Sequence, residues 1–362
     1  MNEQRNLYLA IGISIAIIIF FQFLFPTQPI QTTSFEEDEV LEPATSIDGQ
    51  GNETISEIKS RDEALIETDR VIFSNSSIKG SINLKGAILD DLILSKYKTS
   101  LEPGSDNIQL LLPEGTSNPY YIETGWKELK DTEVELPDLE TIWKTNSTNL
   151  TPSNPVTLSW TNNQNITFKI NYTIDDEYMF SITQEIENKG NTNIEVFPYR
   201  LIKRINTPET INFFILHEGF ISLINDELLE KNYDDIADDC NSSMPSKKEF
   251  CDNKAQGGWL GFTDKYWMSA LIPDANQSIN VNYRYGNNGR DSYRAGYVGQ
   301  IYKVSSGESL EYGGKLFVGA KKLNVLSAYD EKLSIPRFTD AIDWGWFSFL
   351  TKPVSYAINW FF

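Results

Sequence analysis

The pattern of apolar and polar residues first sets apart the N-terminal end of the chain. A nearly unbroken apolar run extends from Leu7 to Phe25, after a short polar tip. At about 1.5 Å of rise per residue, a helix of this length measures close to 30 Å, which matches the hydrocarbon core of a bilayer. The run ends without a small-residue cleavage pattern. We therefore expect residues 1–26 to form an uncleaved transmembrane signal anchor, with a removed signal peptide as the alternative.

The orientation of this anchor depends on a small charge bias. The tip carries both Glu3 and Arg5, and basic residues are enriched on the cytoplasmic side of membrane helices. We expect the tip to lie inside and the bulk of the chain outside. Residues 27–63 contain mostly Pro, Thr, Ser, Gln, Gly and acidic residues without a steady period, so they are predicted to be a disordered acidic linker.

From residue 64 to residue 320 the apolar residues recur with a period of two. Ile166, Phe168 and Ile170 point to one face of such a run, whereas Thr167 and Lys169 point to the other. Many short runs of this kind, separated by turn residues, are typical of a large antiparallel β-sandwich. The predicted strands are 70–73, 78–84, 87–94, 109–112, 166–172, 178–186, 194–197, 210–216, 258–262, 266–272, 278–285, 300–304 and 311–318.

The period changes again after this region. Leu323, Leu326 and Tyr329 recur at helical spacing before Pro336, which predicts an edge helix within residues 321–336.

Residues 340–362 are dense in aromatic side chains, and Lys352 and Pro353 make a buried membrane span unfavourable. We expect an amphipathic helix at the membrane surface, and the alternative is a core helix of the sandwich. Because the aromatic pattern is interrupted at Phe362, we also expect the sequence to be a fragment that leads into further membrane spans.

Charge narrows the classes of partner. The formal net charge is −20, which disfavours nucleic acid, since phosphate backbones are bound by clustered Lys and Arg. An anionic membrane surface would also repel most of the domain. We interpret the charge as a contribution to solubility outside the membrane.

Few residues are candidates for chemistry. Cys240 and Cys251 are the two cysteines; they are expected to form a disulfide or remain free thiols, and a metal site is the less supported alternative. His217 is the single histidine and appears at the end of a predicted buried strand, so we expect a structural role. No phosphate loop, nucleophile elbow or zinc-protease motif is present. We predict no catalytic residue, no metal and no cofactor.

Three sequence blocks together resemble the bacterial insertases of the YidC/Oxa1/Alb3 family. They are the N-terminal tip with Gln4-Arg5-Asn6, the stretch from Gly257 to Trp267 followed by Ile272-Pro273, and Asp343-Trp344-Gly345-Trp346-Phe347 with Lys352-Pro353.

The resemblance implies an inner-membrane protein, not an enzyme, whose large periplasmic domain is a β-supersandwich akin to sugar-mutarotase domains. It further implies an insertase that acts on nascent membrane proteins in the lipid bilayer, alone or with components of the Sec translocon.

The sequence departs from the family in two respects. The family's insertion activity is assigned to a five-helix membrane core with a charged hydrophilic groove, and that core would begin after Phe362. The acidic stretch 225–256 also has no clear counterpart. The resemblance then implies that this part of the chain is a docking or spacing module.

Two other functions remain open at this level. A membrane-anchored carbohydrate-binding or carbohydrate-active sandwich would use His217 and a carboxylate such as Glu218 in an open cleft. An envelope scaffold with a single anchor is the third hypothesis.

Overall fold

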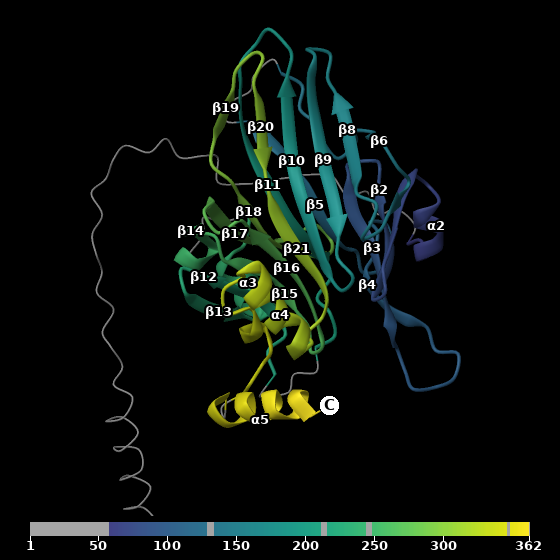
Figure 1. Ribbon diagram of the computed structural model, residues 1–362, viewed down its shortest axis with the longest axis vertical. Coiled ribbons are helices and arrows are strands. Elements are labelled where there is room, and N and C mark those ends of the chain that lie inside the picture. The colour runs from purple at the N-terminus through teal and green to yellow at the C-terminus, as the bar shows by residue number, and fades with distance from the viewer. Residues whose placement is uncertain (1–57, 129–133, 211–215, 244–247, 346–347, 362) are drawn as a thin grey trace, which may run out of the picture. The chain divides into compact units, whose positions relative to one another are not determined.

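The computed structural model describes residues 58–128, 134–210, 216–243, 248–345 and 348–361. They lie in one compact unit, Ser46–Phe362, which consists mainly of two large β-sheets (Figure 1). The predicted anchor and most of the predicted linker lie outside the described residues. Within the described ranges, no helix combines the length and hydropathy that a membrane span requires.

The first sheet, called the β5 sheet below, has eleven strands among the described residues, in the order β14-β17-β18-β11-β5-β3-β2-β1-β7, with β19 paired to β11 and β4 paired to β3. Its strands are β1 (Arg70–Ser74), β2 (Ile78–Asn83), β3 (Ile88–Lys98), β4 (Asn107–Leu111), β5 (Tyr120–Glu128), β7 (Asn149–Leu150), β11 (Ile194–Ile205), β14 (Asp252–Gln256), β17 (Ser278–Asn287), β18 (Asp291–Val298) and β19 (Tyr302–Val304).

The second sheet, called the β10 sheet, has ten strands within the same described ranges, in the order β13-β12-β15-β16-β21-β10-β9-β8-β6, with β20 paired to β10. Its strands are β6 (Lys144–Thr145), β8 (Val156–Thr161), β9 (Ile166–Ile174), β10 (Met179–Asn188), β12 (Gly219–Ile224), β13 (Glu227–Lys231), β15 (Trp259–Thr263), β16 (Trp267–Pro273), β20 (Ser309–Tyr312) and β21 (Gly314–Ala320).

The helices of the described residues are short. They are α2 (Arg61–Leu65), α3 (Tyr233–Asp239), η1 (Glu249–Cys251), α4 (Leu323–Leu333), η2 (Phe338–Ala341) and α5 (Ser348–Phe361). α4 lies within the stretch for which the sequence predicts an edge helix. α2 begins at Arg61, so the last residues of the predicted linker are helical.

Antiparallel pairing dominates both sheets, as the period-two pattern predicts. In β9 and β10, for example, Phe168 lies opposite Ile186 and Ile170 opposite Gln184. One edge of the β5 sheet departs from this pattern, because β1 and β7 pair in parallel. The chain between β1 and β7 is long and includes β2 to β6. Such a connection permits parallel pairing, whereas a tight hairpin joins only antiparallel strands.

One predicted strand is divided in two in the structure. The run 311–318 is two strands, β20 and β21, which pair with successive parts of β10 on either side of Gly313. The predicted strand 210–216 lies mostly outside the described residues. His217, which the sequence analysis places at the end of that strand, lies two residues before β12 begins at Gly219.

The core lies between the two sheets, where aromatic rings from each interlock. Phe73 of the β5 sheet meets Phe180 of the β10 sheet edge to face at 5.2 Å between centroids. Trp126 packs in the same way on Phe168. Such pairs add to the stabilisation from apolar burial because the ring edges and faces carry opposite partial charge. The sheets therefore form a sandwich.

One cation is buried inside this core. Arg200 of β11 is 0% exposed, and its Nε donates to Gln184 Oε1 at 3.1 Å, while its Nη2 donates to the carbonyl of Ile182 at 2.9 Å. Gln184 in turn donates to the carbonyl of Gly125 at 2.6 Å. This chain of bonds joins β11, β10 and β5 across the sandwich, because a buried charge is tolerated only where it is hydrogen-bonded.

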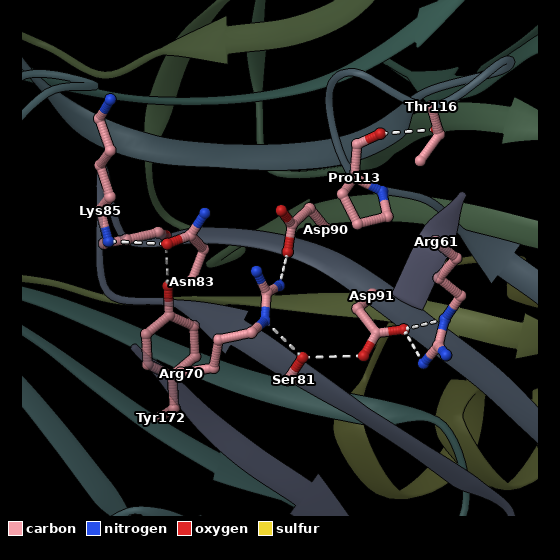
Figure 2. Close-up of polar contacts among 11 residues, drawn as sticks. Arg61, Arg70, Ser81, Asn83, Lys85, Asp90, Asp91, Pro113, Thr116 and Tyr172 are labelled. Atoms are coloured by element: carbon pink, nitrogen blue, oxygen red, sulfur yellow. Dashed lines mark hydrogen bonds and ion pairs between the residues drawn. The ribbon is translucent and has the colours of Figure 1, made fainter. Parts of the chain in front are cut away.

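A second polar network joins α2 to β1, β2 and β3 (Figure 2). Arg61 of α2 donates twice to Asp91 Oδ1, at 2.9 and 2.6 Å. Ser81 donates to Asp91 Oδ2 at 2.8 Å and accepts from Arg70 Nε at 2.7 Å. Arg70 also forms an ion pair with Asp90. These contacts fix the first described helix against the sheet.

Candidate functional site

Helix α5 presents an apolar stripe to solvent. Leu350, Val354 and Ile358 are 57%, 48% and 55% exposed, and their spacing of four residues places them on one side of the helix. On another side, Lys352 Nζ forms an ion pair with Asp340 Oδ1 of η2 at 2.7 Å. One side of α5 is therefore tied to the sandwich, whereas the apolar stripe has no protein contact that would bury it.

The segment that leads into α5, residues 343–345, is called the connector here. Asp343 Oδ2 accepts from the backbone N–H of His217 at 3.0 Å, and its Oδ1 accepts from the N–H of Gly345 at 2.8 Å. Gly345 has a φ of 64°, a left-handed conformation that glycine adopts without strain. The indole N–H of Trp344 donates to the carbonyl of Thr339 at 3.0 Å. The connector is thus held by several directed hydrogen bonds.

The charges around the connector favour this geometry. Burial alone would raise the pKa of Asp340, but hydrogen bonds from Lys352 and Arg337 outweigh burial and lower it. Asp340 therefore remains ionised and keeps its ion pair with α5 at neutral pH. Close by, burial lowers the pKa of Lys321 to about 8, while Asp264 and Asp343 partly oppose the effect.

A cleft of about 350 Å³ lies on the face of the β5 sheet that points away from the core. Its floor is built by register. Lys203 of β11 lies opposite Tyr121 of β5 and Arg294 of β18, and the next row places Leu201 opposite Glu123. Residues 136–139 and Glu114 form the walls. Three strands that are distant in sequence thus bring cations, a carboxylate and aromatic rings together.

Glu123 is the buried acid of this cleft. Burial raises its pKa, and the cations Lys203 and Arg294 partly oppose that shift. Tyr199 lies in the following row, where a Cβ on its partner Gly125 would come within 2.9 Å of the tyrosine ring. Glycine at position 125 is therefore what allows Tyr199 to lie across the strand.

The residues predicted from sequence lie elsewhere. The ring nitrogen Nε2 of His217 contacts the carbonyl of Phe220 at 2.9 Å, and Glu218 Oε1 accepts from the backbone N–H of Lys265 at 3.2 Å. Neither residue lines the cleft. Their contacts are those of residues that fix the start of β12.

The two cysteines form a disulfide, Cys240–Cys251, in which both side chains are fully buried. The metal alternative at these positions is wrong, because the sulfurs bond to each other. In the ranges that the structure describes, no group of three or more His, Cys, Asp and Glu side chains could hold a metal ion.

Sequence reasoning missed the cleft residues. β5 is buried on both faces from Tyr120 to Trp126, so it shows no alternation of polar and apolar residues. The available signal is Glu123, an acid that lies between Tyr120-Tyr121-Ile122 and Trp126.

Comparison with known proteins identifies relatives over most of the chain. The family model of the YidC periplasmic domain matches residues 70–357. "Membrane protein insertase YidC" of Pelagibacter ubique is 35% identical over 364 residues, which cover 99% of this chain and 62% of the relative. The protein of the same name from Rickettsia bellii is 35% identical, with 100% and 63% covered. The chain thus spans less than two thirds of these relatives.

Among solved structures, a galactose mutarotase related enzyme from Lactobacillus acidophilus has a TM-score of 0.45 and 8% identity, over 69% of this chain and 97% of that one. A galactose mutarotase-like protein from Lactobacillus casei has a TM-score of 0.41 and 9% identity, over 69% and 99%. These likenesses are too weak to bear on function. The family model and the curated relatives agree with each other, and the chain belongs to the YidC family, whose periplasmic domain it carries over residues 70–357.

Proposed function

We propose that this chain is the anchor and periplasmic part of a membrane protein insertase, which helps nascent membrane proteins enter and fold in the bacterial inner membrane. The match to the YidC periplasmic domain over residues 70–357 carries this proposal. In it, residues 1–26 anchor the chain, residues 27–63 form the linker and residues 64–320 form the periplasmic domain. The partners are the lipid bilayer, nascent membrane proteins and components of the Sec translocon, but no nucleic acid.

Residues 340–362 have a defined role in this proposal. The stripe of Leu350, Val354 and Ile358 lies in the headgroup region of the outer leaflet, where amphipathic helices bind with their apolar side down. The ion pair between Lys352 and Asp340 then holds the sandwich at a fixed distance from the membrane surface. The periplasmic domain acts as a docking or spacing module and performs no covalent chemistry.

The structure does not support the hypothesis of a carbohydrate-binding or carbohydrate-active sandwich. That hypothesis places His217 and Glu218 in an open cleft, whereas both make contacts with backbone groups outside the cleft.

The proposal is tested in cells whose own insertase is depleted. The complete product of the gene that encodes this chain should restore insertion of a small inner-membrane protein, measured by protease protection. Val354→Asp places a charge in the apolar stripe of α5 and should reduce insertion, whereas the matched control Val354→Leu should not. If the complete product restores no insertion although it reaches the membrane, the proposal is wrong.

A further inference from the structure

We infer that the sandwich touches the bilayer directly through a second surface, formed by the tip of the β3–β4 hairpin, residues 99–106, and the β15–β16 turn, residues 264–266. These two segments are called the tip surface. The inference rests on the proposed function, because α5 supplies the membrane plane. Figure 1 shows the hairpin projecting beyond the body of its sheet.

Contacts within the protein place both segments at the same end as α5. The ring of Tyr97, next to the hairpin tip, packs edge to face on Trp267 at 4.9 Å, and Trp267 is the first residue of β16. The backbone N–H of Lys265 in the turn donates to Glu218. The backbone N–H of the adjacent His217 donates to Asp343 of the connector. Hairpin, turn and connector are therefore linked by direct contacts.

The exposed side chains of the tip surface are those that favour a membrane interface. Leu101 has a relative exposure of 105%, so nothing in the protein covers it, and Tyr266 is 58% exposed. Lys265 Nζ lies 4.8 Å from the centroid of the Tyr266 ring. Tyrosine and lysine place an apolar body in the interface and a polar end among the headgroups. Glu102, which follows Leu101 in the chain, limits the contact to headgroup depth.

The hairpin tip is built to keep its shape. The N–H of Thr99 donates to the carbonyl of Asp106 at 2.9 Å, and the N–H of Ser105 donates to the carbonyl of Glu102 at 3.1 Å. The N–H of Ser100 donates to Ser105 Oγ at 2.9 Å. Backbone groups that are already paired can enter the interface without losing hydrogen bonds to water. The tip therefore presents its apical leucine with little loss of backbone hydration.

A bilayer fits this surface better than a protein partner does. A stable protein interface usually buries about 800 Å² on each side, whereas the tip surface offers two separate projections with a few exposed apolar groups. Lipid adapts its shape to such projections. α5 would already hold the domain at the membrane. The tip surface is then close to the lipid at all times, so a weak interaction is enough to form the second contact.

The test uses one fluorescent label for each variant in the full chain, reconstituted in vesicles of phosphatidylethanolamine and phosphatidylglycerol with bromine on part of the acyl chains. Because the two native cysteines are buried in a disulfide, Leu101→Cys, Val354→Cys and Asn191→Cys each introduce a single reactive thiol. Brominated lipid should quench the label at 101 and at 354, with a blue shift in emission, and should leave the label at 191 unchanged.

Position 191 is a matched control because it is exposed at the opposite end of β10. Just before β10 begins, the backbone N–H of Tyr178 donates to the hydroxyl of Tyr329 in α4 at 3.1 Å. The strand then extends over 10 residues, or about 33 Å. Quenching at 354 without quenching at 101 would overturn the inference and leave the proposed function standing. Absence of quenching at 354 would instead contradict the proposed place of α5.

Discussion

Lys352 of α5 and Asp340 of η2 form an ion pair with 2.7 Å between Nζ and Oδ1, and Arg337 Nε donates to the second oxygen of the same carboxylate at 2.8 Å. η2 is itself packed into the sandwich, because the Phe338 ring meets the Trp259 ring at 5.5 Å. Asp340 therefore joins α5 to the folded core.

Replacing Lys352 by Met should loosen α5 without unfolding the sandwich. The lysine side chain is 36% exposed, so the pair contributes only about 0.5–1 kcal/mol to global stability. Amide hydrogen exchange should speed up in α5 and remain unchanged in β16 and β21. Lys332→Met, at an exposed position of α4, serves as the control. Equal exchange in the Lys352 variant and the control would show that the pair does not hold α5.

The buried Arg200 should be important for stability. Arg200→Met removes a charge that is bonded to Gln184 and to the carbonyl of Ile182, and it leaves Gln184 without one partner. Breaking such a buried network costs about 3–5 kcal/mol, which denaturant unfolding would detect as a lower midpoint. Lys303→Met, on the exposed side of β19, should change stability by less than about 0.5 kcal/mol.

A double variant separates charge burial from packing at this site. Arg200→Met combined with Gln184→Leu should lose less stability than the sum of the single changes, since the second change removes an unpaired amide. Simple additivity would contradict the account of a connected network.

Asp90 should make stability depend on pH. Burial raises its pKa to about 6, although the ion pair with Arg70 opposes this shift. The folded state therefore holds the proton more tightly than the unfolded state. The stabilising contribution of Asp90 is complete below about pH 4 and is lost as pH rises through about 6.

This dependence is measured against Asp90→Asn, which cannot titrate at that position. The free energy of unfolding of the parent minus that of the variant should fall between pH 4 and pH 7, by about 1 kcal/mol or more. Glu102→Gln, at an exposed hairpin position, serves as the control for a substitution that removes a carboxylate. A flat difference for Asp90→Asn would show that the acid keeps its ordinary pKa.

The disulfide between Cys240 and Cys251 should stabilise the domain. It closes a loop with a sequence separation of 11 residues, so its loss is expected to cost about 2–4 kcal/mol. The variant with both cysteines replaced by Ser should unfold at lower denaturant concentration, and reductant should lower the midpoint of the parent but not of the variant. If the parent protein, unfolded in the presence of reductant, kept the same denaturant midpoint as without reductant, the proposed pairing of the two cysteines would be wrong.

Much of the fold could be predicted from the sequence where one face of a strand is buried and the other is exposed to solvent. β9 alternates in burial along its whole length, and its period-two pattern was recognised. β5 and β12 are absent from the predicted strands; β12 is buried at every position and β5 at all but its last two. A strand covered on both faces loses the alternation on which the prediction depends.

The site was less predictable for a related reason. The apolar stripe of α5 follows from spacing along one helix, so sequence alone indicates it. The cleft depends on the register that places Tyr121, Lys203 and Arg294 side by side on three strands. The bond from His217 to Asp343 likewise joins residues far apart in the chain. Neither relationship has a local sequence signal.

The most direct measurement of the central claim is the depth of α5 in the membrane, residue by residue. Single labels at positions 350, 352, 354, 355 and 358 of the full chain in vesicles would be exposed to brominated lipid. Quenching is expected at 350, 354 and 358, where the apolar stripe lies, and weak quenching at 352 and 355. Uniform quenching along the helix, or none at any position, would contradict the claim that α5 lies in the membrane interface.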